Sequence, residues 1–382
     1  MTTNLALVAG FPKSEYQRRE KRVLEKMTAE GLDALLVTAH GRLRYLSGYS
    51  GRGAYFAPFP MILIPGRAPT LVVREYEEPA VRAETWVEKI VPYTHEGDFA
   101  KACADVLRRA GVQAGRIGLE LGCWNFAVND MLALQTQLPE AKMVDATKVV
   151  ISVAAVKSDL ELEVMRSAMV MTDLATRAFY ESLREGVSEI DVQANMIRPV
   201  RQQGFDFSAT PTLLFGERTK LSHGGATSNR ISRNDPAFAE FGAAKHGYYA
   251  GIVRSAVLGS HPEAESIHAL AEETVEAAIA AIKPGATAGA VDAAARKVVE
   301  RAGKPRAFRH RTGYQTGIYW LERGNISLEP EASAVLEEGM TLHMPIILFT
   351  DSGYMFGTSE HVLVTDRGAE ILSRTPHALH KA

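Results

Sequence analysis

The chain has 382 residues, more than a usual single-core domain, so two domains are expected. Its 43 basic and 45 acidic residues nearly balance, and the basic ones form no long run, which argues against nucleic acid and membrane as partners. The two cysteines, Cys103 and Cys123, are too few for a disulfide framework, and the N-terminus shows no signal-peptide pattern. We therefore expect a soluble cytoplasmic protein.

The first part of the chain alternates between helical and strand-like patterns. Apolar residues recur at helical spacing in three segments, at 14–29, 79–84 and 98–110. Short apolar runs typical of strands fall at 32–38, 61–64, 70–73, 116–119 and 143–150. This alternation predicts an α/β domain over residues 1–155, ended by a linker near 152–157.

The second part, residues 156–382, contains two similar helical hairpins. A helical pattern from Ser158 to about residue 184 leads to Gly186, and Ser188 then caps a second helix. A helical pattern at 262–282 is followed at the same spacing by Gly285 and Thr287. The repetition predicts a duplicated fold, although any two amphipathic hairpins could share this pattern.

Strand-like segments surround these helices, at 208–214, 237–241, 248–258, 341–349 and 360–365. Strands that follow pairs of helices predict an antiparallel sheet with helices outside it. The expected fold class is therefore α+β, with a concave sheet face available for a site.

The second part also carries an ordered series of motifs. His223 precedes a strand with Glu240, and the next strand reads Gly247-Tyr-Tyr-Ala-Gly-Ile-Val-Arg254. Farther on stand His310-Arg-Thr-Gly-Tyr314, Gly339-Met-Thr-Leu-His-Met-Pro345 and Ser359-Glu-His361. This series resembles the creatinase, aminopeptidase P and prolidase superfamily. The resemblance implies a C-terminal pita-bread domain (156–382) after an α/β creatinase-type domain (1–155).

The resemblance also bears on metal binding. In metallopeptidases of this superfamily, two Asp, one His and two Glu hold a pair of divalent ions, and the matching positions here read Glu240, Gly251, Tyr314, Met344 and Glu360. Glycine has no side chain, and a Met thioether is a poor ligand for such ions. A member without metal or other cofactor is therefore implied. A single weakly held ion on Glu240, Glu360 and His223 is left open.

Hydrolysis without a metal needs a base or nucleophile, and an acid for the leaving nitrogen. The resemblance assigns acid and base roles to His223, since imidazole titrates near neutrality. Glu240 and Glu360 are expected to face one cavity, where they would bind a cationic amidine or guanidine or attack carbon. The alternatives are a hydrogen-bonded structural histidine and two surface glutamates.

Further residues of the motifs are expected to line the substrate site: Tyr249, Arg254, His310, Arg311, Tyr314 and His343. Tyr314 would donate a hydrogen bond or fill the space that a metal has left. The two arginines would anchor a substrate carboxylate or serve as ion-pair partners in the fold. The two histidines would relay protons or be structural.

Among metal-independent members, ectoine hydrolases resemble the chain most, including the stretch Trp320-Leu-Glu-Arg323. Creatinases resemble it less, since they keep His where this chain has Tyr314. The implied activity is hydrolysis of a non-peptide C–N bond in a cyclic amidine such as ectoine. An Xaa-Pro metallopeptidase and a catalytically silent binding module are the alternatives.

The resemblance further implies a homodimer. The loop 46–51, Leu-Ser-Gly-Tyr-Ser-Gly, resembles a family loop that covers the site of the partner chain. The alternative is a plain glycine-rich turn.

Overall fold

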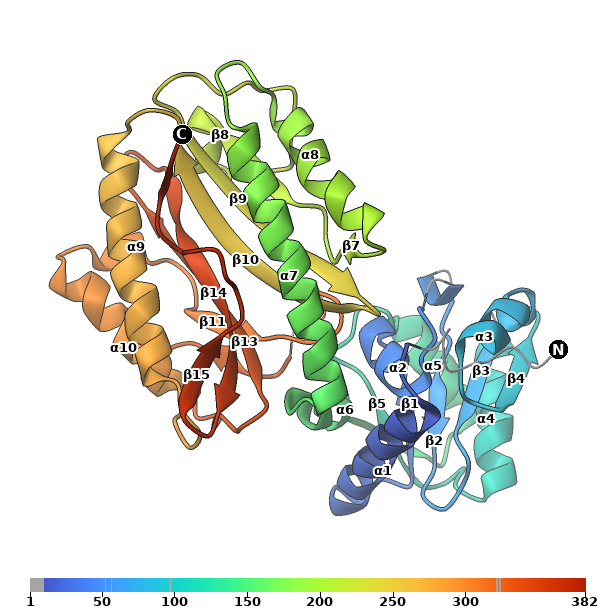
Figure 1. Cartoon of the computed structure of the whole chain (residues 1–382). Coiled ribbons are helices and arrows are strands. Elements are labelled where there is room, and N and C mark those ends of the chain that lie inside the picture. The colour runs from blue at the N-terminus through green and yellow to red at the C-terminus, as the bar shows by residue number, and fades with distance from the viewer. Residues whose placement is uncertain (1–9, 52, 56, 96–97, 321, 323) are drawn as a thin grey trace. The chain divides into compact units, whose positions relative to one another are not determined.

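The computed structural model describes residues 10–382 except 52, 56, 96, 97, 321 and 323. The chain divides into two compact units, Met1–Ala154 and Ala155–Ala382. No helix within the described residues is long and apolar enough to cross a membrane. Each unit is best followed by itself in Figure 1.

The first unit is an α/β layer structure around a mixed six-stranded sheet of order β4-β3-β2-β1-β5-β6. Its strands are β1 (Ala34–Val37), β2 (Met61–Leu63), β3 (Thr70–Arg74), β4 (Lys89–Tyr93), β5 (Arg116–Leu119) and β6 (Lys142–Asp145). Its helices are α1 (Lys13–Ala29), α2 (His40–Ser47), α3 (Glu78–Glu84), α4 (Asp98–Ala110), α5 (Val128–Gln137) and α6 (Thr147–Ala155), with 3-10 turns at Gly53–Tyr55 and Glu75–Glu77.

The predicted strand-like segment with a turn at 143–150 is correct only in its first residues, and the predicted linker at 152–157 is wrong because α6 extends to Ala155. The strand ends at Asp145, and helix α6 begins two residues later. Val149, Val150 and Val153 of α6 are all buried, a spacing that fits one face of a helix. A short run of β-branched residues therefore forms a helix because its apolar face packs against the core.

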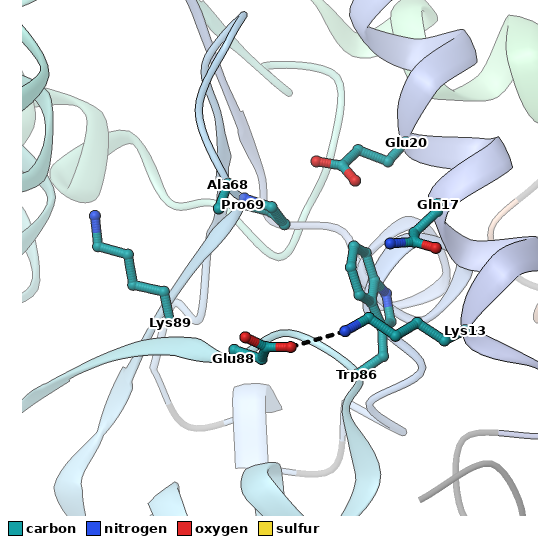
Figure 2. A pocket seen from close by; sticks show the side chains of 8 residues that line it. All are labelled: Lys13, Gln17, Glu20, Ala68, Pro69, Trp86, Glu88 and Lys89. Atoms are coloured by element: carbon teal, nitrogen blue, oxygen red, sulfur yellow. Dashed lines mark hydrogen bonds and ion pairs between the residues drawn. The ribbon is translucent and has the colours of Figure 1, made fainter.

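The first unit also has a surface cavity of about 490 Å³, shown in Figure 2. It is lined by Lys13, Gln17, Glu20, Ala68, Pro69, Trp86, Glu88 and Lys89. Lys13 Nζ lies 2.7 Å from a carboxylate oxygen of Glu88 and 5.9 Å from the centre of the Trp86 ring. Two of its charged groups thus pair with each other, and none of the predicted site residues lines it.

The second unit contains two helix pairs and two five-stranded sheets (Figure 1). Its helices are α7 (Asp159–Ser182), α8 (Glu189–Gln202), α9 (Pro262–Ala281) and α10 (Ala288–Arg301), with 3-10 turns at Gly216–Lys220 and Pro305–Ala307. The first sheet contains β7 (Asp206–Phe207), β8 (Thr212–Phe215), β9 (Pro236–Lys245), β10 (Tyr248–Val257) and β16 (His380–Lys381). The second contains β11 (Gly313–Gln315), β12 (Ser327–Leu328), β13 (Thr341–Phe349), β14 (Met355–Thr365) and β15 (Gly368–Ile371).

The predicted duplication is present in the backbone. Gly186 and Gly285 both have left-handed φ values, 80° and 84°. Gly186 N donates to Ile231 O at 2.8 Å, and Gly285 N donates to Leu336 O at 2.9 Å. Ser188 and Thr287 each accept a hydrogen bond from the backbone three residues on, as the capping pattern predicts. The two halves of this unit thus begin their second helices in the same way.

Each helix pair covers one face of its own sheet. Apolar residues of α7 and α8 pack against Ala239, Phe241, Ala250 and Ile252. Those of α9 and α10 pack against a second group that includes Leu342, Met344, Val362 and Val364. Because side chains alternate along a strand, the residues between these positions face away from the helices. This alternation decides which predicted site residues can meet.

Candidate active site

The two sheets of the second unit meet where β10 runs beside β14, a line that we call the seam. Side chains rather than a backbone ladder join the strands there. Gly251 N donates to His361 Nδ1 at 3.1 Å, and Val253 N donates to Ser359 Oγ at 2.5 Å. Ser255 Oγ donates to Gly357 O at 2.6 Å. Ser359 and His361 are therefore the side chains of β14 that point to β10.

An aromatic cluster lies at the seam, on the sheet face that points away from the helices. The rings of Tyr249 and Trp320 are stacked, with centroids 4.9 Å apart and planes at 16°. Trp320 Nε1 donates to the Tyr314 hydroxyl at 2.9 Å, and that hydroxyl lies 3.0 Å from His343 Nδ1. His343 Nε2 lies 2.8 Å from Ser359 Oγ. A continuous chain of hydrogen bonds thus links three strands and the loop that bears Trp320.

Two glycines make room for the Trp320 indole. Gly242 and Gly251 are direct partners in the β9–β10 pair. A Cβ atom on Gly242 would lie 2.7 Å from Trp320 Cζ3, and one on Gly251 would overlap the same ring more severely. The indole therefore fills the place where a ligand side chain at position 251 would stand.

His361 is neutral because it is fully buried. Burial lowers the pKa of His361 to about 3, and the nearby positive charge of Lys157 acts in the same direction. Its Nδ1 accepts the Gly251 N–H, so the ring proton resides on Nε2, which lies 2.8 Å from Thr316 Oγ1. The imidazole thus joins β10 to the segment after β11.

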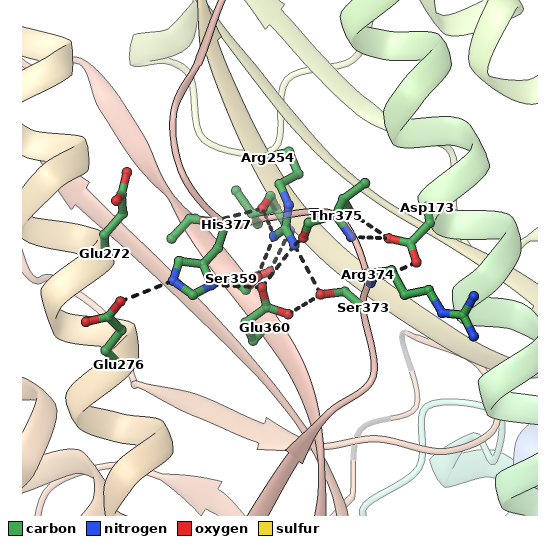
Figure 3. Close-up of polar contacts among 12 residues, drawn as sticks. Asp173, Arg254, Glu272, Glu276, Ser359, Glu360, Ser373, Arg374, Thr375 and His377 are labelled. Carbon is green, nitrogen blue, oxygen red and sulfur yellow. Dashed lines mark hydrogen bonds and ion pairs between the residues drawn. The ribbon is translucent and has the colours of Figure 1, made fainter.

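The prediction that Glu240 and Glu360 face one cavity is wrong. Glu360 points to the helix side of β14, where Figure 3 shows it beside Arg254, Ser373 and His377. Ser359 and His361 point to the other side. It accepts hydrogen bonds from Arg254 Nη2 at 3.0 Å and from Ser373 Oγ at 2.6 Å. Both members of its ion pair with Arg254 are fully buried. The physical reason is the two-residue period of a strand, which sends neighbouring side chains to opposite faces.

Arg254 is committed to this network, which agrees with its structural alternative and contradicts the predicted role as an anchor for a substrate carboxylate. Its guanidinium also donates to the backbone oxygens of Ser359 and Thr375. His377 Nδ1 lies 3.2 Å from Glu360, and this contact raises the pKa of His377. The segment 372–378, which supplies these partners, runs between α7 and α9 in Figure 3.

Met344 also lies on the helix side, within the apolar core beneath α9 and α10. His343 is its neighbour on β13 and points to the seam. The prediction that Met344 takes the place of a metal ligand is therefore wrong. Its side chain faces the helices and not the seam, as that of Glu360 does.

Glu240 lies half-buried on the seam side of β9. It is the direct partner of Val253 on β10 and of Thr212 on β8. Val253 packs there with Leu214 and Phe238, and Gly242 lies two residues along the same face. Of the two glutamates predicted for the site, Glu240 is therefore the one on the sheet face that bears the aromatic cluster.

His223 lies in an exposed turn, residues 221–225, with a left-handed φ of 57°. The turn rests on the same sheet face, because Gly225 forms a bridge with Thr212 and Gly224 packs on Leu214. The structure thus brings the backbone of His223 to the edge of the face that bears Glu240.

Arg311 and His310 lie beside Tyr314, at the start of β11. The Arg311 guanidinium lies 4.7 Å from the centre of the Tyr314 ring and donates to Ser327 Oγ at 3.2 Å. His310 Nδ1 lies 2.6 Å from Arg311 O, and burial lowers the pKa of His310. Of the Trp320-Leu-Glu-Arg stretch, Trp320 joins the cluster, whereas Arg323 lies outside the described residues.

The side chains at the seam do not fit a pair of divalent ions. In the described part of the chain, no three His, Cys, Asp or Glu side chains are grouped so that they could hold an ion. The indole occupies the position above Gly251, and the carboxylate of Glu360 is bound to Arg254 on the other face.

Sequence reasoning missed Gly242, Ser359, Thr316 and His361 as members of the site. The signal was present in β14, where Val362 and Val364 are apolar at every second position. Glu360 shares their register, so it had to face the helices, and its neighbours 359 and 361 had to face the seam.

Comparisons with known proteins agree with this architecture. Residues 163–366 match the model of metallopeptidase family M24, and residues 19–156 match the creatinase/prolidase N-terminal domain. An Xaa-Pro dipeptidase of Pyrococcus horikoshii is 27% identical, with 94% of this chain and 97% of the relative covered. An ectoine hydrolase of Halomonas elongata is 25% identical, with 97% and 98% covered.

The fold is similar to that of solved dipeptidases. The crystal structure of dipeptidase PepE from Mycobacterium ulcerans superposes with a TM-score of 0.86 at 22% identity, and the match covers 97% of this chain and 99% of the other. The model of family M24 matches more than half of the chain, over the helix pairs and sheets described above. This chain therefore belongs to metallopeptidase family M24 and carries a creatinase/prolidase N-terminal domain.

Proposed function

We propose that this member of the family is a metal-independent hydrolase that cleaves a non-peptide C–N bond in a small cationic nitrogen compound. An ectoine-like cyclic amidine is the first candidate substrate. The observation that carries the proposal is the Trp320 indole, which fills the place above Gly251 and stacks on Tyr249. The similarity to a relative named ectoine hydrolase supports it.

The seam face has the chemistry to hold a delocalised cation. Aromatic faces attract cations through their quadrupole, at about 0.5–2 kcal/mol per contact. Glu240 lies on this face and supplies negative charge to the same region. An amidinium carbon already carries positive charge, so it needs less polarisation by a metal than a neutral amide carbonyl does. A carboxylate and stacked aromatic rings can therefore replace two metal ions.

The proposed roles follow from the positions of the side chains. His223, in its exposed turn, would accept a proton from water and return it to the leaving nitrogen. Glu240 would hold the cation or attack the carbon directly. The Tyr314 hydroxyl, linked through His343 to Ser359, would exchange a proton along the buried hydrogen-bond chain. Arg311, whose guanidinium lies over the Tyr314 ring, would hold that ring in place, and His310 would fix the Arg311 backbone.

A substrate panel tests this proposal. Chelator-treated protein is incubated with ectoine, hydroxyectoine, creatine and an Xaa-Pro dipeptide. Mass spectrometry detects a ring-opened product that is one water heavier or, for the linear compounds, two fragments whose masses add up to the substrate plus one water. Turnover of a cationic C–N compound without metal is expected, with a fall of at least about 100-fold in His223→Ala. His95→Ala, which removes an exposed histidine of the first unit, is the matched control.

An Xaa-Pro metallopeptidase is the second candidate function, favoured by relatives that are named Xaa-Pro dipeptidases. It predicts dipeptide cleavage that is lost with chelator and restored by a divalent ion, and two bound ions per chain by elemental analysis. Either result would overturn the metal-independent proposal. Tight binding of a panel member with no turnover would instead indicate a binding module.

We also propose that the chain forms a homodimer in which residues 46–51, the end of α2 and the segment after it, cover the partner's site. Four exposed apolar residues within a short segment of the first unit support self-association: Leu121, Trp124, Val128 and Leu132. Light scattering should give twice the monomer mass, and Trp124→Asp combined with Val128→Asp should give the monomer. An unchanged mass for this variant would remove the support of that surface.

A further inference from the structure

The segment that carries His223 is tied at both of its ends to one buried carboxylate. Glu189 accepts hydrogen bonds from Phe215 N at 2.9 Å and from Arg218 Nε at 3.0 Å, before the His223 turn. After the turn it accepts from Thr227 N and Thr227 Oγ1, both at 2.8 Å, and from Asn229 Nδ2 at 3.2 Å. Glu189 is completely buried. Its two oxygens thus close residues 215–229 into a loop.

The backbone adds a second set of ties at the same place. Glu189 N donates to Asn229 O at 3.0 Å, and Ile190 N donates to Thr227 O at 3.1 Å. Arg218, held by the carboxylate, also donates from Nη2 to Gly225 O at 2.7 Å. That last contact reaches into the His223 turn itself. The position of the turn therefore depends on Glu189 directly and through Arg218.

The other half of the same unit shows what the backbone ties achieve without a carboxylate. Ala288 occupies the place that corresponds to Glu189, directly after the capping residue. Ala288 N donates to Ala334 O and Gly289 N donates to Ala332 O, both at 2.8 Å. The turn into the second helix thus forms there with an alanine. The fold of the helix pair does not by itself require the buried charge of Glu189.

A buried carboxylate loses its hydration, so the donors around Glu189 have to offset that loss. His223 adopts a left-handed φ of 57°, a conformation that is unfavourable for a residue with a Cβ atom. Such a conformation persists when its surroundings fix it. Both halves hold a left-handed residue with a side chain in this loop, His223 and Glu331, but the position after the capping residue bears a buried carboxylate in the half with His223 and an alanine in the other.

We propose that Glu189 is a positioning residue that holds the His223 turn against the seam face. It acts through hydrogen bonds to the two ends of the 215–229 loop and touches no reacting atom. The consequence for catalysis rests on the proposed function, whereas the consequence for the order of the loop does not.

The test compares Glu189→Ala and Glu189→Gln with Asp191→Asn. Asp191 bonds to Ser188 at the same helix end but does not contact the 215–229 loop, so its variant controls for a weakened helix start. Hydrogen exchange is measured by mass spectrometry on peptides that cover 215–229, 189–202 and the corresponding second-half loop at 328–336. Glu189→Ala makes the first half resemble the half that has Ala288.

We expect exchange in 215–229 to rise at least about 10-fold in Glu189→Ala, with 328–336 unchanged, and to rise less in Glu189→Gln. A rise spread evenly over the whole second unit, or no rise at all, would overturn the proposal. Melting temperatures of all three variants show whether they are folded at the assay temperature. This arm of the experiment needs no substrate, so it stands even if no compound in the panel is turned over.

The catalytic arm uses any compound that the wild-type protein turns over. A displaced His223 should lower kcat at least about 10-fold and leave KM within about 3-fold, and Glu189→Ala should cost nothing further when His223 is already alanine. Equal losses in both backgrounds would show that Glu189 acts on the fold in general, which would overturn the positioning role. Failure of the panel with a loosened loop would reject the proposed function and keep the structural inference.

Discussion

The two halves of the second unit form their helix pairs through the same backbone contacts and differ in what they bury beside them. The first half places Glu189 under the 215–229 loop, and the second places Ala288 under the 328–336 loop. The similarity shows that capping residues and left-handed glycines suffice to build the pair. The difference shows that these backbone contacts form with a carboxylate or with an alanine after the capping residue.

The hairpins β9–β10 and β13–β14 divide the seam in a comparable way. The first supplies Gly242, Gly251 and Tyr249, which accommodate the indole, and the second supplies hydrogen-bonding side chains such as Ser359 and His361. On the opposite face, Arg254 of the first hairpin pairs with Glu360 of the second. Experiments that exchange or remove these features can test how far the two halves are independent.

The largest effect is expected at the buried ion pair between the hairpins. Arg254→Met leaves Glu360 buried without its cation, which should lower the free energy of unfolding by about 3–5 kcal/mol. For a unit of this size the melting temperature should fall by roughly 10 °C, measured by calorimetry.

The double variant Arg254→Met with Glu360→Met is the control for that pair. Apolar replacement of both partners should recover most of the loss, since it removes the uncompensated charge. A double variant no more stable than Arg254→Met would show that packing of the arginine, and not its pairing with Glu360, joins the two halves.

A carboxylate grafted into the second half should be harmful. Ala288 is fully buried within an apolar core, so Ala288→Glu would bury a charge there. In the first half, Glu189 is bound by donors from Phe215, Arg218, Thr227 and Asn229. We expect a loss of about 2–4 kcal/mol in unfolding free energy. Ala288→Met separates the added volume from the added charge. If both variants lose the same amount, the contrast with Glu189 is one of space and not of charge.

The glycines at the seam offer a smaller, coupled effect. Gly251→Ala would force the Trp320 ring to move and should cost about 1–3 kcal/mol by urea denaturation. The cost should fall by at least half when Trp320 is already alanine, because the clashing ring is gone. Gly317→Ala is the control, since its nearest neighbour is the flexible end of Lys157 at 3.8 Å. Equal costs in both backgrounds would contradict the fit of indole and glycine.

Local chemistry made much of the fold predictable. Ser188 and Thr287 are capping residues and Gly186 and Gly285 favour left-handed turns, so their repetition indicated the duplicated helix pairs before any contact was known. Helix α6 escaped prediction because its short run of β-branched residues has no local feature that separates a buried helix from a strand.

The site was less predictable, because it depends on which face of a strand each residue takes. A match shifted by one residue turns a side chain to the opposite face, as at Met344 and Glu360. The Trp320 contact joins a loop to β9 and β10, and no periodic pattern encodes such a contact. The five donors of Glu189 likewise come from a segment far along the chain, where only the folded loop brings them together.

The smallest expected effect concerns two histidines of the C-terminal segment, whose pKa values shift in opposite directions. The hydrogen bond to Glu360 raises the pKa of His377, with burial opposing it and Glu276 and Arg254 also nearby. Burial lowers the pKa of His380, which stacks on Tyr180. The stability from His377 is fully present below its unfolded pKa, about 6.5, and is lost as pH rises through the raised value. The stability from His380 is present above about 6.5 and is lost as pH falls through the lowered value.

Melting curves between pH 5 and pH 9 should therefore separate the two residues. His377→Gln should remove a decline in melting temperature above about pH 6.5, and His380→Gln should remove a decline below it. Because solvent reaches both rings, each change should stay within about 2–4 °C. His377→Gln should lose its effect when Glu360 is replaced together with Arg254, because the Glu360 carboxylate is what holds the proton on His377. A slope that persists in the Arg254 and Glu360 double variant, and that His377→Gln still removes, would mean that Glu276 of α9 sets the titration of His377.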